Sequence, residues 1–167
     1  MTERLLKPLP LTAERFAAFG DVIESSRTDA AAMNDARFDR FDDLCKVDVG
    51  DGRISVSISV SRVATRLPYV VHMVERHPLG SQAFVPLSPC RMIVVVAPAA
   101  EAVNENELVA FATNGQQGIN YARGTWHMPL LAFEAGQKFL IVDRAAGKPN
   151  CDFHELANPI LLTDSQA

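Results

Sequence analysis

The chain of 167 residues is 48% hydrophobic and 22% charged, with a formal net charge of −4 and a pI near 5.5. This composition predicts one soluble, globular domain over residues 1–167, since single domains commonly have about 100–150 residues. Lys and Arg are scattered along an acidic chain, which argues against nucleic acids and anionic membrane surfaces as partners.

Membrane and disulfide signals are weak. The longest apolar stretch, residues 92–100, contains a proline and falls far short of the roughly 20 residues that a membrane span needs. The first residues contain no apolar segment followed by a cleavage site, and we therefore expect a cytoplasmic protein. Cys45, Cys90 and Cys151 are odd in number and far apart, which indicates buried free thiols rather than disulfides.

The N-terminal part predicts one short helix and a long loop. Thr12 suits a helix N-cap, Phe16 and Phe19 lie three residues apart on one face, and Gly20 suits the end of the helix. This pattern predicts about two helical turns. The polar and acidic segment 25–43 has little periodicity, so we expect a loop-rich cover there.

The rest of the chain is typical of an all-β protein with minor helices. Apolar residues alternate strictly with serines over residues 54–61, which predicts a strand whose serines face solvent or a dimer partner. Ser59 would reach a ligand if the strand enclosed a polar lumen. Further short β-rich runs follow at 69–76, 81–85, 92–97, 108–113, 118–121, 126–133 and 138–143. Many short strands predict a sandwich or barrel, and the tail after Asn158 is interpreted as surface packing.

The densest group of metal-capable side chains lies in residues 72–84. Glu75 and His77 are two residues apart, so on a strand they share one face. A Pro and a Gly after His77 suit a β-turn that returns Gln82 to its side. His127, after a glycine turn, supplies a fourth group. Two imidazoles, a carboxylate and an amide oxygen suit a borderline divalent ion such as nickel, manganese or zinc.

Several neighbouring residues have a structural interpretation. His72 and Arg76 have the opposite strand parity from Glu75, so we expect a structural role for His72 and a place outside the lumen for Arg76. Trp126 and Tyr121 are more often wall or core than catalysts. Tyr121 is nevertheless a candidate for substrate binding.

The spacing Glu-x-His-x4-Gln at 75–82, followed by Ala-x-Gly-x-x-His at 122–127, resembles the two motifs of the cupin superfamily. Cupins usually show His-x-His-x3,4-Glu and then Pro-x-Gly-x2-His. Here Glu75 stands for the first His, Gln82 for the Glu and Ala122 for the Pro. The resemblance implies a cupin-like β-barrel of the double-stranded β-helix, or jelly-roll, type.

Longer blocks resemble the ureidoglycolate lyase family of allantoin catabolism. They are residues 16–24, 75–84, 113–121, Trp126-His127 with Pro129-Leu130, Asp143-Arg144 and Asn150-Cys151-Asp152. The resemblance implies a homodimer, a divalent metal with nickel named first, and cleavage of (S)-ureidoglycolate to glyoxylate and urea. Ala122 and Met128 stand where some family members have polar or imidazole groups in the outer pocket.

Cleavage of this C–N bond needs a proton taken from the carbinol hydroxyl and a proton given to the departing urea nitrogen. His77, His127 and Glu75 are the candidates for these transfers or for holding a metal. Gln82 and Tyr121 are candidates for contacts with the substrate. The substrate carboxylate also needs local positive charge. The candidates for that charge are Arg62, Arg123 and Arg144.

Two other functions stay open on the sequence. In one, a metal-bound water hydrolyses the ureido group and releases ammonia and carbon dioxide instead of urea. In the other, a non-catalytic cupin binds a small acid as a sensor. An added DNA-binding helix pair would favour the sensor, and the sequence does not indicate one.

Overall fold

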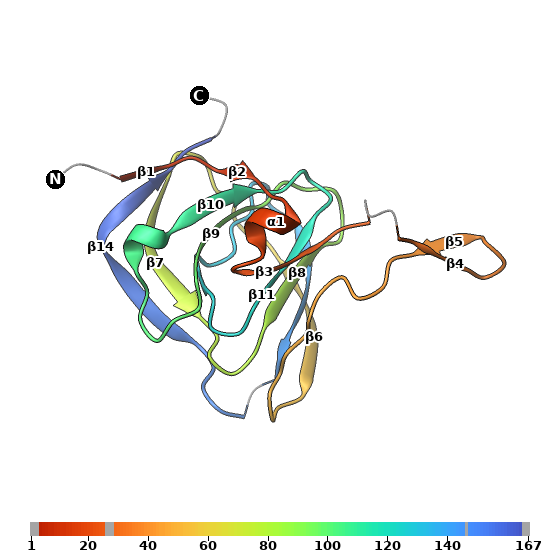
Figure 1. Cartoon of the computed structure of the whole chain (residues 1–167). Helices are drawn as coiled ribbons and strands as arrows, with labels where there is room; N and C mark the ends of the chain where they lie inside the picture. The colour runs from red at the N-terminus through yellow and green to blue at the C-terminus, as the bar shows by residue number, and fades with distance from the viewer. Residues whose placement is uncertain (1–3, 26–28, 146, 165–167) are drawn as a thin grey trace.

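The computed structural model describes residues 4–25, 29–145 and 147–164, and the regular structure in it is almost entirely β (Figure 1). The larger sheet contains, in spatial order, β1 (Arg4–Leu6), β14 (Asp152–Leu162), β7 (Tyr69–Arg76), β12 (Trp126–His127), β9 (Ile93–Ala97), β10 (Val109–Ala112) and β2 (Leu9–Pro10). The second sheet contains β3 (Gly20–Ile23), β11 (Gly118–Tyr121), β8 (Gln82–Pro86), β13 (Lys138–Arg144) and β6 (Ile54–Val60). The predicted all-β barrel with minor helices is confirmed.

The two sheets pack against each other around a shared core. This core joins Phe84, Ile119 and Phe139 of the smaller sheet to Val94 and Val96 of the larger one. A second cluster packs against the other face of β9 through Ile93, Val95 and Ala97. Because β9 is buried on both faces, its sequence is a continuous apolar run rather than an alternating one.

Strand β6 is present where the alternation predicts it, but its apolar side faces outward. Ile54, Val56, Ile58 and Val60 are 53%, 65%, 59% and 50% exposed. Ser59, on the opposite side, lines a cavity between the sheets. The interpretation that the serines form the solvated or dimer-facing side is therefore wrong for Ser59, which faces a partly polar interior, while Ser57 is exposed.

The predicted helix is shorter than two turns. α1 covers Ala13–Phe16, and the Thr12 side chain accepts a hydrogen bond from the amide of Arg15 at 3.3 Å, as an N-cap does. Gly20 does not end this helix but begins β3, with φ +150°. A Cβ at Gly20 would lie 1.8 Å from the carbonyl oxygen of Asn120, so only glycine fits there.

Two further segments differ from the expectation. The loop-rich cover at 25–43 contains a hairpin of β4 (Ala31–Met33) and β5 (Phe38–Arg40), which projects from the body in Figure 1, while residues 26–28 lie outside the described part. The tail after Asn158 is not surface packing, since Ile160 and Leu162 of β14 are buried.

The remaining helical element is the 3-10 turn η1 (Glu105–Glu107). The predicted run 126–133 keeps only the two residues of β12, because Pro129 lacks the N–H that a ladder requires. No helix in the described part of the chain is long and apolar enough to cross a membrane.

Candidate active site

Two neighbouring strands of the larger sheet bring the candidate residues together. His127 of β12 lies directly opposite Glu75 of β7 in the antiparallel register. His77 follows the end of β7 and keeps the parity of Glu75. One ligand atom from each of Glu75, His77 and His127 lies within 4.8 Å of the others. The rings of His77 and His127 are 5.2 Å apart.

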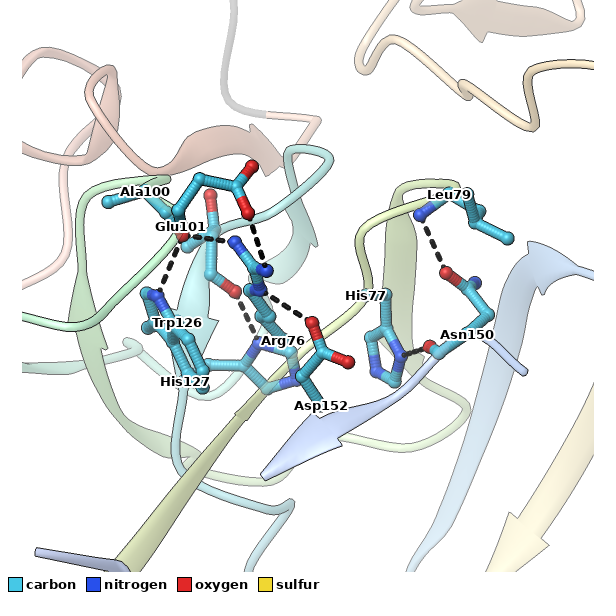
Figure 2. Close-up of polar contacts among 10 residues, drawn as sticks. Arg76, His77, Leu79, Ala100, Glu101, Trp126, His127, Asn150 and Asp152 are labelled. Atoms are coloured by element: carbon cyan, nitrogen blue, oxygen red, sulfur yellow. Dashed lines mark hydrogen bonds and ion pairs between the residues drawn. The ribbon is translucent and has the colours of Figure 1, made fainter. Parts of the chain in front are cut away.

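The two imidazoles are oriented by backbone carbonyls. His127 Nδ1 lies 2.9 Å from the carbonyl oxygen of Thr125, and His77 Nδ1 lies 2.6 Å from that of Asn150 (Figure 2). A carbonyl only accepts, so each Nδ1 carries the proton. The Nε2 lone pair of a neutral His127 then faces the site.

His127 Nε2 is the atom that most needs a partner. His127 is 1% exposed, and its Nε2 has no hydrogen-bond partner among the residues that the structure describes. The nearest charged atom is Glu75 Oε1, at 3.5 Å. A lone pair and a carboxylate repel each other across this gap, and a cation or a proton between them removes the repulsion.

Burial and charge set the ionisation of this group. Burial lowers the pKa of His127 below its ordinary value. This effect is larger than the opposing effect of the Glu75 carboxylate, so the ring is neutral at pH 7. Burial alone would raise the pKa of Glu75, but the hydrogen bond and the positive charge that His127 offers when protonated, the charge of a protonated His77 and the Cys151 thiol outweigh it and hold that pKa below its ordinary value. Glu75 is therefore an ionised carboxylate at neutral pH.

Tyr121 forms a wall of the site. Its ring stacks on that of His127, with centroids 4.0 Å apart and planes 14° from parallel. Burial, with the Glu75 carboxylate, raises the pKa of Tyr121 far above its ordinary value, so the phenol stays protonated. The stacking fixes the plane of the His127 ring. The sequence alone did not predict this contact between Tyr121 and His127.

Gln82 connects the site to the smaller sheet. The turn after His77 brings Gln82 Oε1 to 3.1 Å from His77 Nε2, as its Pro and Gly predict. Gln82 Nε2 in turn donates to Asp143 Oδ2 at 3.4 Å. An amide oxygen thus lies next to the three metal-capable groups.

A cavity of about 520 Å³ opens beside Glu75. Its polar lining residues are Ser59, Ser61, Arg62, Thr65, Glu75 and Gln82. Its apolar lining includes Phe84, Leu130, Ala132, Phe139 and Ile141. Ser59 Oγ is buried and has no hydrogen-bond partner within the described residues. The cavity therefore presents charged and hydrogen-bonding groups to a small polar molecule.

The three candidate arginines lie in different places. Arg62 lines the cavity with Glu75. Arg123 pairs with Asp48 in the half-exposed turn before β12. Arg144 follows Asp143 on β13, so its side chain leaves the opposite face of the strand and pairs with Asp51 at 2.9 Å. The structure brings only Arg62 of the three to the cavity.

Arg76 belongs to a separate network on the other side of β7. Its guanidinium bonds to Asp152 at 2.8 Å and Glu101 at 3.3 Å, and lies 5.2 Å from the centre of the Trp126 ring (Figure 2). His72 is exposed on the same strand. Both residues lie away from the site, as their parity indicates.

A divalent ion fits the donor set of Glu75, His77 and His127. Three protein ligands with room for a substrate oxygen are typical of catalytic metal sites. The observation that supports this fit is the buried Nε2 of His127, which is aimed at a carboxylate and has no hydrogen-bond partner within residues 4–25, 29–145 and 147–164. Both Nδ1 atoms are bonded to carbonyls, which is how proteins orient metal-binding histidines.

Sequence reasoning missed two residues that contact the site. The backbone carbonyl of Asn150 accepts from His77, and the Cys151 thiol donates to Glu75 Oε2 at 3.6 Å. Burial and that carboxylate raise the pKa of the Cys151 thiol to about 11. Both residues lie in a block that resembles the ureidoglycolate lyase family, and this was the only signal that pointed to them.

Residues 3–163 match the family model described as ureidoglycolate lyase. A ureidoglycolate lyase of Pseudomonas entomophila is 45% identical over 152 residues, which cover 90% of this chain and 91% of the relative. One from Pseudomonas fluorescens strain SBW25 is 46% identical over the same shares of both chains. A solved rmlC epimerase from Mycobacterium tuberculosis is 20% identical, with a TM-score of 0.39 over 64% of this chain and 52% of that one. The structural likeness is too weak to bear on fold or function, but the family match covers nearly the whole chain, which belongs to the ureidoglycolate lyase family.

Proposed function

We propose that this chain, acting as one domain, cleaves the C–N bond of (S)-ureidoglycolate to give glyoxylate and urea. The observation that carries the proposal is the meeting of Glu75, His77 and His127 beside a partly polar cavity, in a chain of this family. The substrate is a carbinolamine, so its decomposition needs proton transfer and charge stabilisation but no redox cofactor.

Glu75, His77 and His127 would hold a divalent ion, with the amide oxygen of Gln82 nearby. Two imidazoles and a carboxylate suit a borderline ion such as nickel, manganese or zinc, and nickel is our first choice because the family resemblance implies it. Such an ion, when bound, supplies Lewis acidity that lowers the pKa of a hydroxyl oxygen.

The Glu75 carboxylate moves the proton in this proposal. It is ionised and faces the cavity, and only one of its oxygens is needed to hold the ion, so the other accepts the proton of the carbinol hydroxyl as the C–N bond breaks. The hydroxyl oxygen becomes the aldehyde oxygen of glyoxylate. The same carboxyl group then returns its proton to the departing nitrogen, which completes urea. One group serves both steps because the oxygen and the nitrogen are attached to the same carbon.

Two residues of the cavity would bind the rest of the substrate. Arg62 presents a guanidinium, whose forked geometry matches the substrate carboxylate. Ser59 Oγ, which is buried and unpartnered among the described residues, would hydrogen-bond the ureido group. The apolar wall of the cavity would exclude water from the reacting atoms.

Incubating the pure protein with ureidoglycolate and assaying urea, ammonia and glyoxylate together tests this function. We expect urea and glyoxylate in equal amounts. Ammonia in place of urea would instead establish the hydrolytic route, and binding without turnover would establish a sensor. Either result would overturn the proposed lyase.

Metal removal is a second test. Treating the protein with a chelator and desalting it is expected to lower urea release by about tenfold or more, and added Ni²⁺ or Mn²⁺ should restore it. Elemental analysis before and after treatment checks that the ion has left. Full activity in protein shown to be free of metal would contradict the role of the ion.

We further propose a homodimer formed through the outer face of β6. Ile54, Val56, Ile58 and Val60 form an exposed apolar stripe, and Leu140 and Val142 of β13 lie beside it in register. Contiguous apolar surface of this kind is rare on monomers and marks association sites. A second copy of the chain is the partner that the family resemblance implies.

The Ile58→Lys substitution is expected to convert this dimer to a monomer, because it places a charge at the centre of the stripe. Light scattering after size-exclusion chromatography measures the mass. Phe153→Lys is the matched control, since Phe153 is 63% exposed on β14 of the other sheet and should leave the dimer intact. A monomeric wild-type protein, or a dimeric Ile58→Lys variant, would exclude this interface.

We place the protein in the cytoplasm as part of this proposal. Cys45, Cys90 and Cys151 are all free thiols. Free thiols are typical of a reducing compartment.

A further inference from the structure

Three consecutive residues of the chain contact the side chains of three consecutive residues around the site. Asn150 accepts through its backbone oxygen from His77 Nδ1 at 2.6 Å. Cys151 donates through its thiol to Glu75 Oε2 at 3.6 Å. Asp152 accepts from Arg76 Nε at 2.8 Å. Each residue at 75–77 is thus held by a different residue of the segment 150–152.

The strand register produces this correspondence. β7 and β14 are antiparallel, and Asp152 lies opposite Arg76. The chain that precedes Asp152 therefore runs past the end of β7, where His77 begins the turn. Figure 2 shows His77 and Arg76 in separate networks, bonded to Asn150 and to Asp152 respectively.

We propose that Asn150 and Cys151 are positioning residues of the active site: Cys151 fixes the carboxylate of Glu75 and Asn150 fixes the ring of His77. The inference rests on the proposed function for its kinetic consequence. The contacts themselves predict an effect on ion binding, which is measurable without turnover.

Asn150 makes two hydrogen bonds near the site, one through its backbone oxygen and one through its side chain. Its side-chain oxygen accepts from the backbone amide of Leu79 at 2.7 Å, while its backbone oxygen holds the imidazole (Figure 2). Leu79 lies in the turn that follows His77. The side chain of Asn150 therefore fixes the distance between its own carbonyl and the histidine ring.

Cys151 completes the environment of the Glu75 carboxylate. Oε1 faces His127 Nε2 at 3.5 Å, and Oε2 accepts from the thiol. Because the thiol holds Oε2, Oε1 is the oxygen that is turned toward His127, and the carboxylate plane has one preferred orientation. Without the thiol, Oε2 loses this contact and the carboxylate rotates more freely.

Paired substitutions separate positioning from general damage. Asn150→Ala removes the side-chain acceptor, whereas Asn150→Asp keeps an oxygen for Leu79. Cys151→Ala removes the donor, whereas Cys151→Ser keeps one. We expect each alanine variant to lose about tenfold or more in kcat with little change in KM, and each conservative variant to recover most of that loss.

Ion binding and histidine tautomers provide readouts besides activity. Zn²⁺ titrated into metal-free protein by calorimetry is expected to bind about tenfold more weakly to the two alanine variants. Long-range ¹H–¹⁵N NMR spectra should show the Nδ1–H tautomer of His77 in the wild type and a mixture in Asn150→Ala. Cys45→Ala, which removes a half-buried thiol elsewhere, should leave all three measurements unchanged.

The outcomes distinguish this inference from the proposed function. If the alanine variants fold and keep wild-type kcat, Zn²⁺ affinity and tautomer, the positioning role is wrong. If an alanine variant does not fold, its conservative partner, Asn150→Asp or Cys151→Ser, is compared with the wild type instead. That variant keeps the contact, so a clear loss of its function would also contradict the positioning role. If the wild type does not cleave ureidoglycolate, the proposed function fails while the Zn²⁺ and NMR measurements still test the positioning.

Discussion

Replacing His127 by Ala is expected to lower kcat for urea release by about 10²–10⁴-fold, the range typical of losing a group that acts on the reacting atoms. His127 presents the buried Nε2 that faces Glu75 and that has no hydrogen-bond partner in the described part of the chain. The loss should appear chiefly in kcat, because the ring would hold the ion that acts on the reacting hydroxyl and does not bind the substrate carboxylate. Initial rates over a range of ureidoglycolate concentrations measure it.

Two controls make this result interpretable. His127→Gln keeps much of the side-chain volume, so an equal loss of activity in a folded protein separates chemistry from packing. His72→Ala removes an exposed imidazole from the same strand as Glu75 and should leave kcat within about twofold. If both His127 variants fold and stay near the wild-type rate, the proposed site is wrong even though the family assignment stands.

Arg76 is a poor control for the same experiment. Its parity correctly places it outside the site, but its side chain is only 11% exposed and is paired with Asp152 and Glu101. Removing it would leave those carboxylates without their cation and weaken the attachment of β14 to β7. Strand parity identifies which face a residue occupies, not what it contacts there.

Strand β6 shows how far an alternating pattern can be interpreted. The alternation defines two faces, and the usual expectation is that the apolar face is buried. In this protein Ser59 of the serine face lines a cavity with Arg62 and Glu75, while Ile58 and its apolar neighbours face outward. The distinction depends on what the opposite sheet and a partner present to each face, and a single strand carries no information about either.

Residue spacing in the sequence was enough to predict part of the site. The interval between Glu75 and His77, and the turn that returns Gln82, are short-range features that the sequence expresses directly. The contact of His77 with Asn150 spans 73 positions and uses a backbone oxygen. Every residue has such an oxygen, so no residue type marks the contact, and only the pairing of β7 with β14 reveals it.

Replacing Phe16 by Ala is expected to lower the free energy of unfolding by about 3–5 kcal/mol, the range for deleting a buried aromatic ring. Phe16 is fully buried although its helix has a single turn, and its ring lies 5.8 Å from those of Phe19 and Phe111 and 6.3 Å from that of Tyr121. The short helix has little stability of its own, so this packing holds it against the barrel.

Urea unfolding followed by circular dichroism measures the Phe16→Ala effect. Phe153→Ala is the matched control, because Phe153 is 63% exposed and its loss should cost no more than about 0.5 kcal/mol. A cost below about 1 kcal/mol for Phe16→Ala would show that the core collapses into the space, or that the ring packs less closely than these distances indicate. Since Tyr121 stacks on His127, the substitution should also loosen the wall of the site, so the activity of the folded variant should fall while that of Phe153→Ala should not.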